Sequence, residues 1–487
     1  MNTIIVYDNH IMPDVFIRNI VGEKTFGEII TKRVSIKDRF KKDLQAAGFD
    51  GELLEYDHSW ELSQIKKRLK GAPGQAKILH LFSSCLCLPD GKEALRILYE
   101  KTGYAKENYL VRDDNKNILG FIMSDIDDYA EFLEMASDRL KEDETYKRYR
   151  FVFAEMLTGG FYDLSVYSNF QNYITGSFDT RFFNSVSGDD HVVRKTSHDK
   201  GKIKREYDFY GLLPDDMKPW FVMPYDYMET ADSASYSMKR YHMADLALRW
   251  VHGAITPKEF DKLLEIIFYF LSHRARRQIS AQEYNKTSEK LYLTKVRERV
   301  ALLKQHRDYE RLNTLSKTDG REYIDILMEK YEKLYGDLVN STEFDHISVI
   351  GHGDLCFSNM LFDKNTELLM LIDPKGASDA EEMWTDPYYD LAKLSHSVCG
   401  MYDLFNYGLY RLDIDENLTC RLELESEGGE YEKKFAEALE KNGYDLKAVR
   451  VFEVSLFLSM LPLHMDNPKK VFAFMKNADR IMQEISR

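Results

Sequence analysis

The sequence predicts an α+β fold in three parts: an α/β domain, a small β-rich lobe and a larger helical lobe. Three observations predict it. Short apolar strands alternate with amphipathic helical stretches over residues 1–142, β-type runs dominate residues 143–235, and helical periodicity dominates residues 236–487. A chain of 487 residues is also too long for one hydrophobic core, which supports a division into several domains.

The composition is that of a packed globular chain. Apolar residues make up 44% of it, and the formal net charge of −14 disfavours a general nucleic-acid surface. Five cysteines form neither a paired framework nor a zinc pattern, and the N-terminus lacks the features of a signal peptide. No apolar run reaches the roughly 20 residues of a membrane span. We therefore expect a cytoplasmic protein with reduced thiols and no transmembrane segment.

The first part reads as alternating strands and helices. Its clearest strands are "TIIVYD" at the start, "AKILHLF" at residues 76–82 and "NILGFIM" at residues 117–123. Dense charge without an apolar stripe follows in "SDRLKEDETYKRYR", so we expect the domain boundary near Glu142.

The second and third parts differ in secondary structure. Residues 143–235 contain the strand-like runs "RFFNSV", "DHVVRKTS" and "WFVMPYDY" around one helical stretch, "GKIKREYDFYGLLP". Residues 236–487 contain helical patterns at 257–277, over the long series 282–335, at 430–443 and at 446–461. The third part is therefore predicted to be mostly α-helical.

A cluster of polar residues lies between apolar runs in "HGDLCFSNMLFD" and the following "LIDPKG". Asp354 and Asn359 are five residues apart, and Asp373 follows 14 residues later. In phosphoryl transfer a carboxylate orients the attacking hydroxyl, while an amide oxygen and a second carboxylate bind magnesium. This order of Asp, Asn and Asp matches the known kinase pattern. It predicts Asp354 as the catalytic base and Asn359 and Asp373 as metal ligands.

Each of these residues alone has an ordinary structural explanation, because Asp and Asn are common at turns and helix caps. The ordered set of His, Gly, two acids and an amide favours the functional interpretation. We interpret His352 as a scaffold for the loop, since the spacing to the asparagine makes Asp354 the better base.

These motifs, together with "DPYYDLAKLSHS", resemble the aminoglycoside phosphotransferase and choline kinase family, relatives of protein kinases that phosphorylate small-molecule hydroxyls. The resemblance covers roughly residues 150–487. It implies a bilobal protein-kinase-like fold, ATP and Mg2+ as cofactors, and a small-molecule alcohol as substrate. It also implies that Asp390 is the buried acid that anchors the loop. Lys375 departs from many relatives, and its role stays open between electrostatic help at the phosphates and a surface turn.

The resemblance further implies a lysine that holds the nucleotide phosphates. Lys195 lies in the alternating run "DHVVRKTS", and alternation turns Arg194 to the opposite face. Glu206 occupies the following helical stretch, where the lysine-pairing glutamate of the family is expected.

Two more nucleotide contacts follow from the same resemblance. "NSVSGDD" is expected to cover the phosphates through Ser185, Ser187 and Gly188, although a single glycine makes the signal weak. Met223 is expected near the centre of a strand that carries the adenine-binding hinge. The choice between ATP and GTP stays open.

The acceptor pocket is expected around "GASDAEEMWTDPYYD", where Asp379, Glu381, Glu382 and Trp384 are candidate ligands. Acidic and aromatic groups suit choline or an aminoglycoside by charge and cation–π attraction. Sugars remain an equal alternative, since acids also accept hydrogen bonds from hydroxyls.

The runs "SLFLSMLPLHMDNP" and "SNFQNYITGSFDTRFFNSV" are similar to phosphotransferase domains fused to nucleotidyltransferase-like domains in bacterial surface-polysaccharide pathways. The first domain lacks the glycine-rich loop and lysine of an active nucleotidyltransferase, and Asp125, Asp127 and Asp128 are interpreted as a solvated helix start. We therefore expect a noncatalytic α/β partner, or a degenerate relative, that binds the other lobe or a second subunit as a homo-oligomer.

The sequence thus predicts an ATP-dependent phosphotransferase that acts on a hydroxyl of an amino alcohol, a sugar or a related polysaccharide precursor. Two alternatives stay open. One is a bifunctional kinase and nucleotidyltransferase of surface-polysaccharide synthesis, and the other is a pseudokinase that serves as a binding module. The complete set of Lys, Asp, Asn and Asp argues against the pseudokinase.

Overall fold

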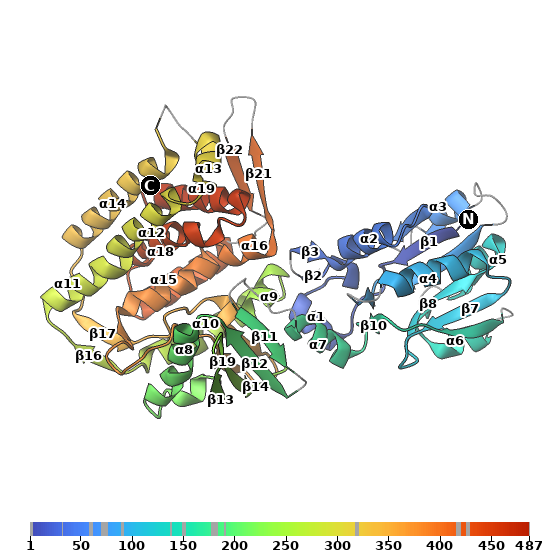
Figure 1. The fold of residues 1–487 in the computed structure, drawn as a ribbon, viewed down its shortest axis with the longest axis horizontal. Coiled ribbons are helices and arrows are strands. Elements are labelled where there is room, and N and C mark those ends of the chain that lie inside the picture. Colours follow the sequence, from blue (N-terminus) through green and yellow to red (C-terminus); the bar gives the residue numbers. More distant parts are fainter. Residues whose placement is uncertain are drawn as a thin grey trace. The chain divides into compact units, whose positions relative to one another are not determined.

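The chain divides into two compact units in the computed structural model (Figure 1). The first unit comprises residues 1–177 with 252–254, and the second comprises residues 178–251 with 255–487. The structure describes residues 3–31, 33–57, 62–69, 76–88, 92–136, 139–148, 152–176, 184–188, 191–316, 321–414, 420–424 and 429–486.

A six-stranded mixed sheet in the order β4-β1-β5-β8-β7-β9 forms the centre of the first unit. β1 runs parallel to both of its neighbours, while β8 runs antiparallel to β5 and β7. Every residue of β1 is buried, because helices cover both faces of the sheet. The strands are β1 (Thr3–Asp8), β4 (Glu52–Tyr56), β5 (Lys77–Phe82), β7 (Asn108–Arg112), β8 (Ile118–Met123) and β9 (Phe153–Leu157).

Alternate residues of β1 face two separate cores. Ile4 and Val6 pack with α3, α5 and α6 on one face, while Ile5 and Tyr7 pack with α2 and α4 on the other. The helices of this unit are α1 (Val15–Val21), α2 (Ile36–Ala46), α3 (Leu62–Leu69), α4 (Lys92–Gly103), α5 (Ile126–Ala136), α6 (Asp143–Arg148) and α7 (Tyr167–Gly176), and its short strand pairs are β2 (Ile30–Thr31) with β3 (Val34–Ser35) and β6 (Cys85–Cys87) with β10 (Phe161–Asp163).

The first unit is longer than the domain expected from the sequence. β9 pairs in parallel with β7, and β10 pairs with β6, so residues beyond 150 complete the first unit. The expected boundary near Glu142 therefore falls inside this unit. The extent of the unit is set by the pairing of β9 with β7, about 45 residues earlier in the chain. The local charge density on which the expected boundary was based does not indicate such distant pairing.

The second unit begins with a small β-rich lobe, as the sequence predicts. Its four-stranded antiparallel sheet has the order β11-β12-β14-β13, and α8 packs on it through Ile203. The strand expected at residues 220–227 starts only at Pro224, because residues 218–220 form a 3-10 turn that contains Pro219. The elements are β11 (Asn184–Gly188), β12 (Val192–Ser197), α8 (Lys200–Leu212), β13 (Pro224–Glu229) and β14 (Ala234–Lys239).

Helices dominate the larger lobe of the second unit, which confirms the predicted two-lobed α+β architecture. α18 is buried on all sides and packs against α12, α14, α15 and α19. The helices are α9 (Leu246–Val251), α10 (Pro257–Ser272), α11 (Ala281–Glu289), α12 (Lys295–Lys304), α13 (Tyr309–Ser316), α14 (Tyr323–Ser341), α15 (Pro387–Val398), α16 (Tyr402–Tyr407), α17 (Gly429–Lys441), α18 (Leu446–Met460) and α19 (Pro468–Ile485).

Short strands in the same lobe carry the polar motif. β18 and β19 form a hairpin, and β17 lies between β16 and β20. The helix expected at residues 257–277 ends at Ser272, because residues 276–278 pair with β17. The strands are β15 (Ala244–Asp245), β16 (Arg276–Gln278), β17 (Ile347–Ile350), β18 (Met360–Asp363), β19 (Leu368–Leu371), β20 (Trp384–Thr385), β21 (Tyr410–Ile414) and β22 (Cys420–Leu424).

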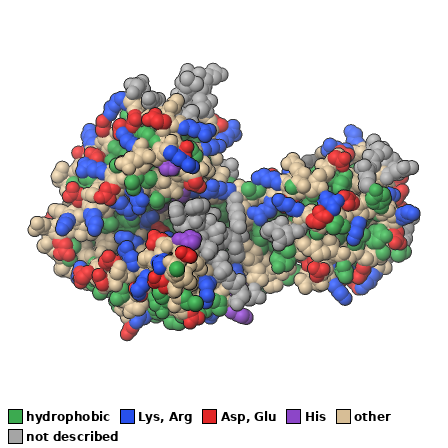
Figure 2. All heavy atoms as spheres, viewed as in Figure 1, with side chains coloured by type: hydrophobic (Ala, Val, Ile, Leu, Met, Phe, Trp, Pro, Cys, Tyr) green, Lys and Arg blue, Asp and Glu red, His purple; other side chains and the backbone are tan. Residues whose placement is uncertain are grey.

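The surface charges and the cysteines do not indicate a further functional site. Basic and acidic side chains are interspersed over the face of the molecule shown in Figure 2. The four cysteines whose side chains are described are all buried and free. No helix in the described part of the chain is long and apolar enough to cross a membrane.

Candidate functional site

A buried carboxylate anchors the loop that follows β17. Asp390 on α15 accepts hydrogen bonds from the backbone N–H groups of His352 (2.9 Å) and Gly353 (2.8 Å). It also pairs with the guanidinium of Arg274 at 2.9 Å. All the oxygens of this fully buried acid thus have partners, as a buried charge requires. Asp390 lies where the sequence predicts the loop anchor.

His352 is held as a neutral ring. Burial lowers the pKa of His352 below its usual value, although the charges of Asp390 and Asp354 oppose this. Nε2 of the ring lies 2.9 Å from the carbonyl oxygen of Ile372, and Nδ1 accepts the N–H of Asp354 at 3.2 Å. These contacts use both ring nitrogens, which supports a scaffold role for His352.

Asp354 presents an accessible carboxylate beside a lysine. Its Oδ1 lies 2.8 Å from Nζ of Lys393, and its side chain is 41% exposed. Burial would lower the pKa of Lys393, but the negative charge of Asp354 outweighs it and raises that pKa. Lys393 therefore stays cationic and favours an ionised Asp354, which is the form a general base needs.

Asn359 and Asp373 lie on adjoining positions of the β18–β19 hairpin. The side-chain N–H of Asn359 donates to the backbone carbonyl of Asp354 at 2.8 Å. The backbone carbonyl of Asn359 accepts the N–H of Ile372 at 3.0 Å. This leaves the amide oxygen of Asn359 for a cation. Asp373 has a φ of 55°, a left-handed conformation that is costly for a residue with a side chain.

The donor set at this hairpin fits a hard cation such as Mg2+, since both candidate ligands are oxygen atoms. Among the described residues, no three His, Cys, Asp or Glu side chains are grouped to hold a metal ion. A magnesium ion held by one amide, one carboxylate and substrate phosphates would not need such a group.

A buried ion-pair chain connects the small lobe to the metal loop. Nζ of Lys195 lies 2.8 Å from Oε2 of Glu206 on α8 and 2.9 Å from Oδ1 of Asp373. Burial opposes the charge on Lys195, but Asp373 and Glu206 together raise its pKa. Burial raises the pKa of Glu206, and Tyr236 donates a hydrogen bond to it at 3.1 Å. The expected pairing of Lys195 with Glu206 is thus observed.

The other expected nucleotide residues are less informative. Gly188 pairs with Val193 across the β11–β12 hairpin. The side chains of Ser185 and Ser187 and residues 189–190 lie outside the described part of the chain. Met223 lies just before β13 and is 54% exposed, not at the centre of a strand. Its neighbours in sequence help to line a small cavity of about 20 Å³ that also includes Glu206 and Asp373.

The expected acceptor residues are engaged with arginines and backbone groups. The guanidinium of Arg277 lies 4.4 Å from the ring centroid of Trp384 and donates to Glu381 at 2.8 and 3.1 Å. Arg205 lies 3.4 Å from Glu382. Asp379 accepts the backbone N–H groups of residues 381 and 382. Arg277 thus contacts two of the four candidate acceptor residues, Glu381 and Trp384.

Two further basic residues near the site were not singled out in the sequence. Lys295 donates a hydrogen bond of 2.9 Å to the hydroxyl of buried Tyr389, one turn before Lys393 on α15. Burial would raise the pKa of Tyr389, but the charges of Lys295 and Lys393 lower it. Lys393 has a sequence signal, since it lies within the motif "DLAK"; Lys295 lies in an ordinary charged helix.

Lys375 belongs to the same basic region. Its backbone N–H donates to the carbonyl of His352 at 2.9 Å. Desolvation of its amine by the surrounding protein lowers the pKa of Lys375, and the charges of Lys295, Arg205 and Lys290 lower it further. Tyr389 acts in the opposite direction. Lys375 is thus an exposed residue whose amine is influenced by other cations.

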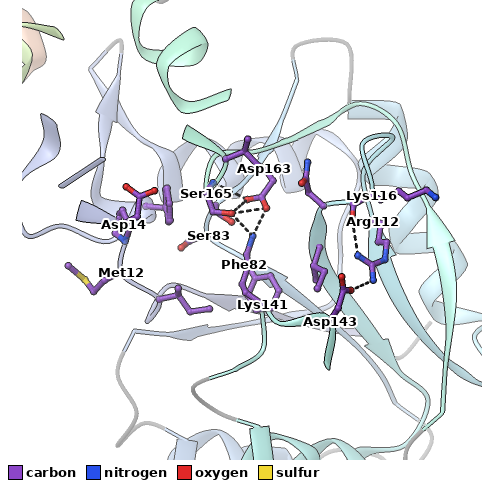
Figure 3. A pocket seen from close by; sticks show the side chains of 17 residues that line it. Met12, Asp14, Phe82, Ser83, Arg112, Lys116, Lys141, Asp143, Asp163 and Ser165 are labelled. Atoms are coloured by element: carbon purple, nitrogen blue, oxygen red, sulfur yellow. Dashed lines mark hydrogen bonds and ion pairs between the residues drawn. The ribbon is translucent and has the colours of Figure 1, made fainter. Parts of the chain in front are cut away.

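A separate pocket of about 480 Å³ lies in the first unit (Figure 3). Loops after β1 and β5 contribute to it, at the carboxyl ends of strands where α/β sheets commonly bind ligands. Four of its charged groups form two pairs: Lys141 bonds Asp163 at 2.7 Å, and Arg112 pairs with Asp143, while Asp14 and Lys116 also line the pocket. The loop after β1 contributes Ile11, Met12, Pro13 and Asp14.

Asp8 at the end of β1 does not line this pocket. It is fully buried and pairs with His10 and with His80, whose Nε2 lies 2.8 Å from Oδ2. Burial would raise the pKa of Asp8, but the hydrogen bonds from His10 and His80 lower it to about 2. The acid is therefore a structural part of the sheet and does not itself face a ligand.

No family model matches the chain, and no curated protein is found to be similar to it in sequence. Similar solved structures include the aminoglycoside phosphotransferase APH(4)-Ia (12% identity, TM-score 0.36, 65% of this chain and 99% of that chain). Others are a microcompartment-associated aminopropanol kinase (13%, 0.35, 66% and 97%) and a putative fructosamine-3-kinase from Haemophilus somnus 129PT (11%, 0.36, 65% and 96%). With TM-scores below 0.5, these likenesses carry no conclusion about function.

Proposed function

We propose that the second unit is an ATP-dependent phosphotransferase that phosphorylates a hydroxyl of a small molecule. The observation that carries the proposal is the chain of Glu206, Lys195 and Asp373, with separations of 2.8 and 2.9 Å. It joins a helix and a strand of the small lobe to the loop beside Asp354 and Asn359. Kinases need this lysine–glutamate pair and the metal-binding aspartate together in the active state.

The proposed reaction is a direct transfer of the γ-phosphoryl group. The acceptor oxygen forms a bond to the γ-phosphorus while the bond from that phosphorus to the β,γ-bridging oxygen breaks, and ADP leaves. The proton of the acceptor hydroxyl passes to Asp354. Lys195 holds the nucleotide phosphates, Glu206 positions Lys195, and Asn359 and Asp373 hold Mg2+. The bound metal neutralises charge on the phosphates.

The test is ATP consumption by the full-length protein with a panel of amino alcohols, sugars and sugar acids. Lys195→Met should lower acceptor-dependent consumption by about 10²-fold or more, because it removes a cation that stabilises charge on the phosphates. Arg194→Met is the matched control. Arg194 is the next residue of the same strand but contacts Ser237 on the other face, so its loss should leave turnover within about twofold.

Two outcomes would contradict the proposal. Turnover that survives in folded Lys195→Met would remove the role of the ion-pair chain. ATP binding without phosphorylation of any acceptor in the panel would favour the alternative of a binding module.

The bifunctional alternative depends on the first unit, and we expect this unit to have no nucleotidyltransferase activity. A triphosphate site needs closely spaced backbone N–H groups and a cation after the first strand. Here that loop supplies Pro13, which has no N–H, and the acid Asp14 to the pocket. Of the three basic residues that line the pocket, Lys141 and Arg112 are paired with acids, and Lys116 follows β7 and not the first strand.

The measurement is pyrophosphate release by the intact protein with each NTP and the phosphorylated products of its kinase reaction. No release above the blank is expected from Asp354→Asn protein supplied with these products. Sustained release that disappears on Lys141→Met in the pocket would contradict this prediction and revive the bifunctional function. A matched control is Lys147→Met, which changes an exposed lysine of the same unit that pairs with Glu144 and does not line the pocket.

A further inference from the structure

The helix that follows β16 contains a π-helical turn. α11 ends at Glu289, residues 290–294 form the π turn, and α12 starts at Lys295, whose N–H donates to the carbonyl of Lys290. In an ordinary α-helix two residues five apart project about 140° from each other. A π turn instead places residues i and i+5 one above the other. Lys290 and Lys295 therefore leave the helix on the same side.

On this side of the helix, Lys295 contacts α15, the helix that also contacts the proposed catalytic base. Nζ of Lys295 donates to the hydroxyl of Tyr389 at 2.9 Å. One turn further along α15, Lys393 contacts Asp354 at 2.8 Å. The contact of Lys295 with Tyr389 and the contact of Lys393 with Asp354 are thus one helical turn apart on α15.

Lys375 approaches the same base from the metal loop. A Cβ built on Gly353, the residue before Asp354, would lie 2.6 Å from Cβ of Lys375, so the two backbones are in close contact. Gly353 also has a φ of 78°, which favours glycine at this position. The backbone N–H of Lys375 donates to the carbonyl of His352 at 2.9 Å, which fixes Lys375 beside the loop that carries Asp354.

These lysines lack carboxylate partners within the part of the chain that the structure describes. Lys290, Lys295 and Lys375 have no ion pair there, whereas Arg205, Lys195 and Lys393 each pair with an acid. The positive charge of these three lysines is opposite in sign to the formal net charge of the whole chain, which is −14. Uncompensated cations around a polar site attract anions and repel cations.

We propose that the phosphate acceptor is an anionic alcohol, whose carboxylate or phosphate group is bound by Lys290 and Lys295 while its hydroxyl lies at Asp354. This inference rests on the proposed kinase function and names its substrate class, a hydroxy acid such as a sugar acid or a phosphorylated alcohol. It favours an anionic acceptor over the cationic amines and neutral sugars that the sequence left open. Lys375 adds positive charge between the acceptor and the nucleotide.

Inorganic phosphate is a suitable probe, because it carries the anionic group without committing to a carbon skeleton. Calorimetry measures phosphate binding to full-length protein already saturated with AMP-PNP and Mg2+, so that the nucleotide site is filled. Saturable binding is expected in the wild type. The double variant Lys290→Met, Lys295→Met should weaken it at least tenfold and leave AMP-PNP affinity within twofold.

Two variants provide the controls. Lys295→Gln keeps a hydrogen-bond donor toward Tyr389 and should fold normally while weakening phosphate binding. Lys333→Met on α14 removes an exposed lysine that also has no ion pair within the described residues, and phosphate binding should be unchanged. An effect of Lys333→Met as large as that of the double variant would mean that only net charge matters and would overturn the proposal.

A second arm compares acceptors on one skeleton: serinol, glycerol, glycerate and glycerol 3-phosphate. The two anions should be phosphorylated with at least tenfold higher kcat/KM than serinol, and that preference should fall in the double variant. Absence of phosphate binding, equal binding in the double variant, or a preference for serinol would overturn the inference. If AMP-PNP does not bind to the wild type but phosphate binding still depends on both lysines, the kinase function fails and the anion site stands.

Discussion

Asp354→Asn is expected to lower turnover by about 10²- to 10⁴-fold, the usual contribution of a general base. The substitution removes the carboxylate that is 41% exposed at the site but keeps the size of the side chain. Nucleotide affinity should stay within a few fold, since Lys195 and Asp373 are unchanged. Steady-state kinetics with the best acceptor and calorimetry with AMP-PNP measure the two effects separately.

The loss of charge at Asp354 leaves Lys393 without its partner, so folding needs its own control. Asp261→Asn removes an ion pair of the same length, 2.8 Å to Lys434, at a half-exposed position of α10. The double variant Asp354→Asn, Lys393→Met should recover any lost thermal stability without recovering turnover. Near-native turnover of Asp354→Asn with every acceptor would show that another group is the base.

Asp373→Asn and Asp390→Ala are expected to fail in different ways. Asn tolerates the left-handed backbone at position 373 but is a weaker, neutral ligand. Asp373→Asn should therefore reduce the gain in AMP-PNP affinity that Mg2+ provides, with little loss of stability. Asp390→Ala breaks a buried pair with Arg274 and leaves two N–H groups without an acceptor, so we expect about 3–5 kcal/mol of destabilisation.

The two variants serve as controls for each other. AMP-PNP titrations with and without Mg2+ give the metal effect, and urea unfolding gives the free energy of unfolding. Per molecule of folded protein, Asp390→Ala should retain most of the metal effect. Equal loss of the metal effect in both variants would refute the separation between a metal ligand and a structural anchor.

The sequence by itself determined the elements and much of the candidate site. Strand β1 and helices α8, α17 and α18 follow from apolar periodicity, because burial selects side chains at the spacing of each element. The residues of the motif around Asp354 are close in sequence, so their common loop could be recognised without tertiary information. The roles assigned to these residues remain predictions.

Tertiary structure alone decided what surrounds that motif. β9 joins the first sheet by pairing with β7, and local charge could not show this distant partner. Arg277 lies over the ring of Trp384 and pairs with Glu381, contacts between distant parts of the chain that the sequence did not show. Lys290 and Lys295 share a face only because the helix makes a π turn there. The interaction between two charges depends on their distance in space. Sequence spacing alone, applied with the geometry of an ordinary α-helix, would place these two lysines on different sides of the helix.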